Sequence, residues 1–356
     1  PMGGGSMVAS SGPSTPSISS LIGVAGHSKD VNSVAWNASG DKLASGSDDR
    51  TAQVYDVDNT GRAKQLLRLE PHQGSVVQVC WDPVNPNRLA TVASGEKDKT
   101  VRLWDTRTHK SVKEYKMTAE YINVAWSPEG GSLAVGSSIG GASSKDDTAK
   151  DYISIIDVRE HKIKKHKFPF EVNEFSFSPN SRHMILTTEL GTVEVYKFIV
   201  GGNLKHVRSI QAHTDNCYTL DIDPTGQFMA VGSKDSLVSL WETDDLICLR
   251  SVGDHSTPVR TVSFSPCGAY LASASYDHGV DIASVATGER LHKAETNCGI
   301  NQIAWQPKLG GTKSLVAFAK DAKNSDSRRA TETDQYLQIL SVPTASLASL
   351  AEESSS

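Results

Sequence analysis

Four groups of residues along the chain combine the side chains of a nucleophilic catalytic centre. In the first group, His27, Ser45 and Asp49 offer an imidazole, a hydroxyl and a carboxylate, the set with which serine hydrolases attack a carbonyl. A catalytic centre is not needed four times in one chain, whereas a buried hydrogen-bonded network stiffens every repeat in which it occurs. We therefore predict a structural network. With their aromatic residues the groups are His27, Ser45, Asp49 and Tyr55; His72, Ser94, Asp98 and Trp104; His213, Asp235 and Trp241; and His255, Ser273 and Asp277.

Other signatures of catalysis or cofactor binding do not occur in the sequence. It contains no GxxxxGK[ST] phosphate loop, no HExxH motif and no CxxC motif, and its five cysteines lie far apart. No apolar run approaches the roughly 20 residues that span a bilayer. The net charge of −5 argues against a protein that binds nucleic acid with its whole surface, although a local basic patch stays open. We predict a protein that is not an enzyme, needs no cofactor or metal, and resides in the cytosol or nucleus.

The recurring residues are positioned by a sequence repeat. Seven six-residue segments share one hydrophobic pattern, and their last residues stand at positions 36, 81, 126, 177, 222, 264 and 305. The spacing of 41 to 51 residues is close to the period of a four-stranded propeller blade. The segments are VNSVAW, VVQVCW, YINVAW, VNEFSF, CYTLDI, VRTVSF and INQIAW. The repeat predicts an all-β, seven-bladed β-propeller.

Each segment alternates large apolar residues with small or polar ones, as a strand with two different faces does. In the first segment Val34 and Trp36 are apolar, while Ser33 and Ala35 are small. We expect the apolar face to pack between neighbouring blades and the other face to line a narrow central channel. The polar residues of this face are expected to form a channel ring, which is either a hydrated structural feature or a surface that contacts a ligand. Its members are Ser33, Gln78, Asn123, Glu174, Thr219, Thr261 and Gln302.

The ends of the chain lie outside the repeat. Residues 1–16 are interpreted as an expression scar (PMGGGS) followed by a disordered Ser-, Gly- and Pro-rich stretch. The propeller is expected to span residues 17–342. Residues 343–356 are expected to form a C-terminal tail.

The polar signature weakens along the chain. The third, fourth and seventh repeats have Met117, Phe168 and Thr296 where a histidine is expected. The fifth has Val231 at the serine position, and the sixth has Ala283 in place of the tryptophan. We expect the blades that lack the histidine to be held by apolar packing.

The Gly26-His27 opening and the Trp104-Asp105 ending are typical of the WD-repeat family. In that family a sequence repeat is offset from a blade by one strand, so the resemblance implies that residues 17–24 form the outer strand of the last blade beside residues 336–342. Such a pairing closes the ring and removes open sheet edges. Within that family, residues 258–291, and above all the segment DHGVDIA at residues 277–283, resemble the subunit 3 family of the THO complex, over roughly residues 26–342. The resemblance implies a nuclear, non-catalytic scaffold of the THO/TREX assembly, which couples transcription to mRNA packaging and export. It implies the large helical THO subunits as partners, RNA reached indirectly through the complex, and neither a membrane nor a small-molecule substrate.

Departures from the repeat indicate where a partner could bind, because a scaffold presents its specificity on loops. Residues 137–150 and 320–333 are polar insertions, expected between the second and third strands of blades three and seven; they either contact a partner or have no role in binding. A basic run at residues 161–167, expected on the outer strand of blade three, either prevents edge-to-edge strand pairing or binds RNA or an acidic partner. The candidate partner contacts are Lys145, Lys150, Arg328, Arg329, Lys162, Lys164, Lys165 and Arg260.

Two other functions stay open. The segment WDTR ending at Arg107 resembles the WDxR box of propellers that dock onto cullin-RING ubiquitin-ligase adaptors, which makes a substrate receptor conceivable. Alternatively, Asn32, Tyr218 and Arg260 at the upper ends of the inner strands line a pocket that reads a histone tail or another peptide. The second alternative requires a defined pocket at that place.

Overall fold

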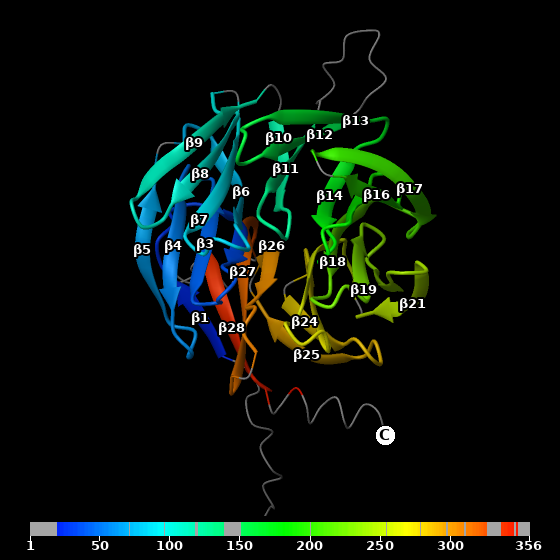
Figure 1. Cartoon of the computed structure of the whole chain (residues 1–356). Helices are drawn as coiled ribbons and strands as arrows, with labels where there is room; N and C mark the ends of the chain where they lie inside the picture. The colour runs from blue at the N-terminus through cyan, green and yellow to red at the C-terminus, as the bar shows by residue number, and fades with distance from the viewer. Residues whose placement is uncertain are drawn as a thin grey trace, which may run out of the picture.

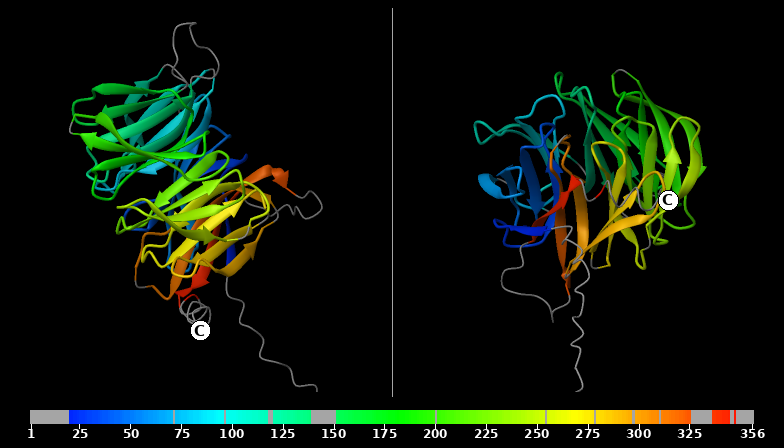
Figure 2. Two further views of the ribbon diagram at one scale, coloured as in Figure 1. Left: turned by 90° about the vertical axis from the view of Figure 1, so that its right-hand side faces the viewer. Right: turned by 90° about the horizontal axis from the view of Figure 1, so that it is seen from below.

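The computed structural model describes residues 20–344 and Leu347, apart from residues 71, 96, 118–119, 139–150, 200, 254, 278, 297, 310 and 326–335. Its strands form seven antiparallel four-stranded sheets that follow one another around a closed ring (Figure 1). Figure 2 shows the same ring from the side and from below. The structure confirms the predicted seven-bladed propeller.

Blades one to four each consist of four strands that are consecutive in sequence and run in order from the channel outward. Blade one is β2 (Val31–Trp36), β3 (Lys42–Ser47), β4 (Ala52–Val57) and β5 (Ala63–Leu69). Blade two is β6 (Ser75–Trp81), β7 (Arg88–Ser94), β8 (Thr100–Asp105) and β9 (Lys110–Lys116). Blade three is β10 (Glu120–Trp126), β11 (Ser132–Ser138), β12 (Asp151–Asp157) and β13 (Ile163–Phe168). Blade four is β14 (Val172–Phe177), β15 (His183–Thr188), β16 (Thr192–Ile199) and β17 (Asn203–Gln211).

Blades five and six have the same consecutive order, and blade seven takes its outer strand from the start of the chain. Blade five is β18 (Cys217–Ile222), β19 (Phe228–Ser233), β20 (Val238–Glu242) and β21 (Ile247–Val252). Blade six is β22 (Val259–Phe264), β23 (Tyr270–Ser275), β24 (Gly279–Ser284) and β25 (Arg290–Glu295). Blade seven is β26 (Cys298–Trp305), β27 (Lys313–Ser325), β28 (Leu337–Pro343) and β1 (Ser20–Val24).

The ring is closed by strands from opposite ends of the chain. β1 pairs antiparallel with β28, with Ser20 opposite Ser341 and Val24 opposite Leu337 (Figure 1). This is the closing strand predicted from the sequence. One expectation about blade seven was wrong. β27 continues to Ser325, so the first residues of the insertion expected at 320–333 belong to a strand paired with β26.

The hydrophobic core lies between neighbouring blades. One buried cluster joins Trp36 and Tyr55 of blade one to Ala317 and Ile339 of blade seven, and corresponding clusters fill the other blade interfaces. The apolar face of each inner strand thus packs between blades, as its alternation predicted. The fit is close: at Gly46 on β3, an added Cβ would lie 2.7 Å from a side-chain carbon of Val76 in blade two.

All seven inner strands carry a β-bulge near the end at which the strand begins. This end of the channel is called its upper end. The pairing register shifts between the first and third residue of each segment, for example between Val31 and Ser33 in β2. The strict alternation expected from the sequence therefore fails at this point, because a bulge inserts one extra residue and redirects its side chain. The bulged residues include Asn32 and Arg260, whose side chains line the upper mouth of the channel.

Candidate functional site

The first of the four catalysis-like groups is a closed hydrogen-bonded network in blade one. His27 lies in the connection between β1 and β2, with Nδ1 2.9 Å from an Asp49 carboxylate oxygen and Nε2 2.7 Å from the Ser45 hydroxyl. The Tyr55 hydroxyl donates to Gln53 at 2.9 Å. Burial by itself would raise the pKa of the Asp49 carboxyl. The hydrogen bonds from His27 and Thr51 outweigh burial and hold this pKa well below its usual range. With His27, Ser45 and Tyr55 buried, the serine is engaged with its neighbours and not presented to a substrate.

In blade two the structure corrects one member of the predicted group. His72 Nδ1 lies 3.1 Å from Asp98, but its Nε2 lies 2.7 Å from the hydroxyl of Thr91, not from Ser94. The same Thr91 hydroxyl accepts the indole N–H of Trp104 at 2.8 Å. Ser94 is the last residue of β7, three residues further along, where it lines a surface pocket between blades one and two. The sequence offered serine and threonine on the same strand, and only the strand register decides which one reaches the histidine.

Blade five completes its network from a different strand. Val231 occupies the expected serine position, and it pairs with Ser239 on the neighbouring strand β20. The Ser239 hydroxyl lies 2.8 Å from His213 Nε2 and accepts the indole N–H of Trp241 at 2.7 Å, while His213 Nδ1 lies 3.0 Å from Asp235. The sequence pattern did not indicate Ser239, because this serine stands on the third strand of its blade and not at the second-strand position of Ser45. A neighbouring strand can supply the same hydroxyl.

Blade six departs most from the pattern. His255 Nε2 lies 2.8 Å from Ser273, but Asp277 accepts the backbone N–H of Ser256 at 2.8 Å in place of the histidine. The carboxylate that pairs with His255 Nδ1 is instead that of Asp281 on β24, at 4.0 Å. Burial lowers the pKa of His255. Asp277 therefore keeps the backbone contact that Asp49 and Asp98 also make in their blades, whereas Asp281 is the carboxylate that faces the histidine ring.

The blades without a histidine are held partly by apolar and partly by polar contacts. Phe168 packs edge-on against Tyr196 with ring centroids 5.5 Å apart. Blade four also has a buried carboxylate that the repeat pattern did not indicate: Glu194 lies 2.9 Å from His206 Nε2 and accepts from Ser209 at 2.7 Å. In blade seven the Thr296 hydroxyl donates to a backbone carbonyl at 2.7 Å. Apolar packing alone, as expected from the sequence, does not describe these blades.

Five members of the channel ring link their blade to the next one. Gln78 accepts the backbone N–H of Val124 at 2.8 Å, and Glu174 accepts that of Leu220 at 2.8 Å. Ser33, Thr261 and Gln302 make the corresponding contacts to blades two, seven and one. Ser33 is almost fully buried and is not among the residues that line the channel mouth, whereas the other six members of the ring are.

Tryptophans at the lower ends of the inner strands link the blades in the opposite direction. The indole N–H groups of Trp36, Trp81 and Trp126 each donate to a backbone carbonyl of the preceding blade, at 3.0, 3.1 and 3.2 Å. Trp305 has the same position in blade seven, but among the described residues its buried indole nitrogen has no hydrogen-bond partner. The same directional contact thus joins blade one to blade seven, blade two to blade one, and blade three to blade two.

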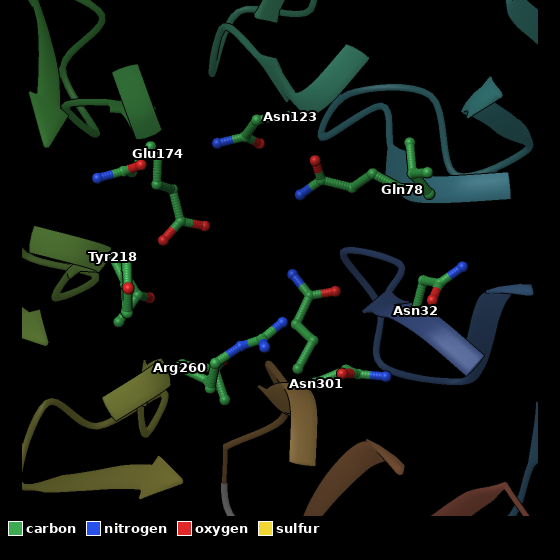
Figure 3. A pocket seen from close by; sticks show the side chains of 12 residues that line it. Asn32, Gln78, Asn123, Glu174, Tyr218, Arg260 and Asn301 are labelled. Carbon is green, nitrogen blue, oxygen red and sulfur yellow. The ribbon is translucent and has the colours of Figure 1, made fainter. Parts of the chain in front are cut away.

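A polar cavity of about 290 Å³ opens at the upper mouth of the channel. In Figure 3 the side chains of Gln78, Glu174 and Arg260 extend into one central opening, with Asn32 and Tyr218 at its wall. The Arg260 guanidinium lies over the ring of Tyr276, 4.8 Å from its centroid, and donates to its hydroxyl. The amide groups of the bulged asparagines donate to the next blade, as Asn173 does to the Cys217 carbonyl at 2.9 Å. The residues predicted for a peptide pocket are therefore brought together around a defined cavity.

Two carboxyl groups of the channel have raised pKa values. Burial raises the pKa of Glu174 to about 7, with Asp221 adding a like charge, although hydrogen bonds from Thr219 and Leu220 act in the opposite direction. Burial likewise raises the pKa of Asp221 to about 7. Asp221 accepts the backbone N–H of Phe264 at 2.8 Å, which joins blades five and six. These carboxyl groups each join two neighbouring blades by accepting a backbone N–H group.

The predicted basic contacts lie partly within the described structure. Lys164 and Lys165 stand on β13, the outer strand of blade three, and Lys162 precedes that strand. The Lys162 ammonium pairs with Glu160 at 2.7 Å, and the Lys165 ammonium lies 4.9 Å from the ring centroid of Tyr152. Lys145, Lys150, Arg328 and Arg329 lie outside the described residues.

Arg107 pairs with a residue of its own turn. Its guanidinium donates to both carboxylate oxygens of Asp105, at 3.0 and 2.7 Å, at the start of the β8–β9 turn. This bidentate pair lowers the pKa of Asp105 to about 2. The WDxR segment therefore has a local role in the turn, and most of the Arg107 side chain stays exposed.

Neither a metal centre nor a membrane-spanning element is found in the part of the chain that the structure describes. No three His, Cys, Asp or Glu side chains there are placed to hold a metal ion. No helix among those residues is long and apolar enough to cross a bilayer.

Comparison with known proteins assigns the propeller to a family. The family model described as the THOC3 beta-propeller domain matches residues 27–319. The chain belongs to the THOC3 β-propeller family. The match begins at His27 of the first network and ends within β27, so it includes six whole blades and part of the seventh.

Individual relatives agree with membership of the THOC3 β-propeller family. The chain is 44% identical to THO complex subunit 3 of Arabidopsis thaliana over 301 residues, which cover 84% of this chain and 89% of that protein. It is 29% identical to the WD repeat-containing protein AAC3 of Dictyostelium discoideum, over 85% of this chain and 64% of that protein. It is 24% identical to the nuclear distribution protein PAC1 of Arthroderma otae, over 88% of this chain and 72% of that protein.

Proposed function

We propose that the protein is a non-catalytic scaffold subunit of a nuclear THO/TREX complex, which couples transcription to the packaging and export of mRNA. The observation that carries the proposal is the 44% identity to a THO complex subunit 3 over most of both chains. The partners are the large helical THO subunits, and RNA is reached through the complex.

The arrangement of the polar residues supports a scaffold. Each histidine that could have served as a catalytic base is buried against a hydroxyl group, as His27 and His72 are. The channel carboxylates accept backbone N–H groups of adjacent blades. Such hydrogen-bonded networks make a rigid body, and a rigid disc loses less conformational entropy when its faces or rim bind a larger partner.

Affinity purification from nuclear extract at moderate salt, with nuclease present, tests the scaffold role. We expect near-stoichiometric recovery of the large THO subunits by mass spectrometry, independent of nuclease. Recovery of a cullin-RING adaptor that is lost in Arg107→Ala would support the substrate-receptor alternative instead. Loss of all partners after RNA digestion would show that the protein meets the complex only through RNA.

A second candidate function is peptide recognition at the upper mouth of the channel. It is favoured by the 290 Å³ cavity, in which the Arg260 cation and the Glu174 carboxyl face one opening (Figure 3). The purified protein should then bind peptides on a histone-tail array, and Tyr218→Ala should weaken that binding about tenfold or more. An array without signal would exclude the histone-tail form of this function.

A further inference from the structure

The outer hairpin of blade four overhangs blade three. Its strands β16 and β17 have eight and nine residues, whereas the two outer strands of the other blades have five to seven residues each. The extra length carries the hairpin turn onto β13 (Figure 1). There His166 Nε2 lies 2.7 Å from the Gly202 carbonyl oxygen, and Lys164 donates to the Asn203 side chain.

A groove of about 420 Å³ lies where the hairpin meets blade three. Gly202, at a φ of +74°, packs so closely that an added Cβ would lie 3.0 Å from a methyl carbon of Ile155. Gly201, at a φ of +85°, has open space where a Cβ would stand. Ile155 and Ile163 supply aliphatic lining, and Lys162 and Lys164 lie along the groove.

The surface around the groove is positively charged in a chain whose net charge is −5. Strands β13 and β17 carry the exposed Lys164, Lys165, Lys167 and Lys205, and neither strand contains Asp or Glu. Arg208 of β17 is directed to the other side, where it donates to the Asp245 carbonyl oxygen of blade five at 3.0 Å. The acidic residues beside the groove are engaged. Glu160 pairs with Lys162 at 2.7 Å, and the Asp157 carboxylate accepts the backbone N–H groups of the β12–β13 turn.

We propose that this groove binds an acidic segment of a protein partner, with one aliphatic side chain of that segment inserted against the exposed Ile163, above the buried Ile155. Charge complementarity selects an acidic occupant, because a positive surface on an acidic protein attracts and orients negatively charged partners. The proposal rests on the proposed scaffold function and adds the contact surface and the chemistry of the partner.

The apolar residues favour a protein over RNA as the occupant. Single-stranded RNA is bound largely by stacking its bases on exposed aromatic side chains. Every large hydrophobic side chain that is exposed in the described part of the chain is aliphatic. Ile163 lines the groove and Ile199 pairs with Asn203 next to it, and these two side chains are 42% and 39% exposed. Aliphatic side chains next to lysines match an acidic, amphipathic peptide.

Blade one offers a matched control for a charge-reversal experiment. In blade three the backbone N–H of Asp157 donates to the Lys162 carbonyl, and in blade one that of Asp58 donates to the Arg62 carbonyl in the same turn. Arg62 and Lys64 of blade one thus correspond to Lys162 and Lys164. Both are exposed, and replacing this pair by glutamate changes the net charge by the same amount as replacing the groove pair. The groove variant is Lys162→Glu with Lys164→Glu, and the control variant is Arg62→Glu with Lys64→Glu.

The test measures binding of two fluorescent probes of equal charge, a peptide of alternating glutamate and leucine and a single-stranded poly(U) RNA, to the full chain. We expect the groove variant to weaken peptide binding about tenfold at physiological salt and the control variant less than twofold, with equal melting temperatures. Ile163→Asp should weaken peptide binding similarly. Equal peptide affinities for the groove and control variants, or RNA binding that is tighter than peptide binding and is lost in the groove variant, would overturn the proposal.

Co-expression with the large THO subunits separates this proposal from the scaffold role. We expect the groove variant to co-purify at least about fivefold less of those subunits than the wild type and the control variant do. Co-purification that is equal in all three proteins would keep the scaffold role and overturn the groove as its contact surface. If even the wild type recovers no THO subunit, the scaffold role fails, and the peptide measurement alone decides whether the groove binds acidic segments.

Discussion

Single hydroxyl groups decide whether a blade's polar network is complete. In blade two the Thr91 hydroxyl lies between two buried groups: it accepts the indole N–H of Trp104 and is also hydrogen-bonded to His72 Nε2. A buried polar group that loses its partner costs about 1–3 kcal/mol, more than an ordinary hydrogen bond contributes. The most sensitive position of the network is therefore the residue that links two buried groups.

Replacement of Thr91 by valine should destabilise the protein by about 2 kcal/mol, because it keeps the shape of the side chain and leaves Trp104 and His72 unpaired. Ser94→Ala is the control, and its cost should stay within about 0.5 kcal/mol. Denaturant unfolding of the two variants measures the difference. Equal costs for both substitutions would contradict the assignment of Thr91 to the network.

Glu174 makes stability depend on pH in a predictable direction. Its pKa is about 7 in the folded protein, above the value of about 4.3 in an unfolded chain, so the folded state holds a proton that the unfolded chain has lost between those pH values. The stability contributed by this proton is fully present below about pH 4 and is lost as pH rises through about 7. Glu174→Gln removes the charge and keeps an acceptor for the Leu220 N–H.

Glu174→Gln should therefore raise the melting temperature at pH 8 by about 2 °C or more and have a smaller effect at pH 5. Thermal unfolding of wild type and variant at both pH values gives the change in melting temperature that the substitution causes. This change reports the titration of Glu174, since the other titrating groups are common to both proteins. A gain that is larger at pH 5 than at pH 8 would show that the carboxyl is charged in the folded state.

The inner strand is the element that carries most of the information for this fold. Its upper residues accept backbone N–H groups of the next blade, and its final tryptophan donates to the preceding blade. These contacts run in opposite directions across the same junction and fix the rotation of one blade relative to its neighbour. The bulge in each inner strand adds the residues that line the channel mouth.

Trp126 and Trp305 have the same position in their blades, which allows a matched comparison of two tryptophans. Trp126 donates to the Cys80 carbonyl at 3.2 Å, whereas the buried Trp305 nitrogen has no partner among the described residues. Both Trp→Phe substitutions remove a similar apolar area, but only Trp126→Phe removes a hydrogen bond. We expect Trp126→Phe to cost about 1 kcal/mol more than Trp305→Phe in equilibrium unfolding. A larger cost at Trp305 would indicate that its indole N–H is satisfied in solution.

At the scale of the whole molecule, two sets of contacts close the ring. β1 covers the outer edge of blade seven through five residue pairs with β28. Closer to the axis, Gln302 accepts the N–H of Val34 at 2.9 Å, and Trp36 donates to the Ala304 carbonyl at 3.0 Å. The inner contacts join the same two blades without the N-terminal strand.

Deletion of residues 1–25 should lower the melting temperature by several degrees and leave the protein folded. The deletion exposes the edge of β28, while the inner contacts between blades seven and one persist. A chain that begins at Ser20 keeps β1 and is the control. Differential scanning calorimetry compares the three proteins, and an unchanged melting temperature after removal of residues 1–25 would refute closure by β1.

The sequence by itself determined the seven blades and, beyond the bulge, the faces of the inner strands, because both follow from local periodicity repeated seven times. The closing strand followed from the resemblance to the WD-repeat family, in which a repeat is offset from a blade by one strand. It also placed Asn32, Tyr218 and Arg260 at the channel mouth. Only the tertiary structure decided between Thr91 and Ser94, supplied Ser239 from an adjacent strand, and put the turn at Gly202 over Ile155. Each of these depends on strand register or on contact between blades, and neither property is encoded in the spacing of residues within one repeat.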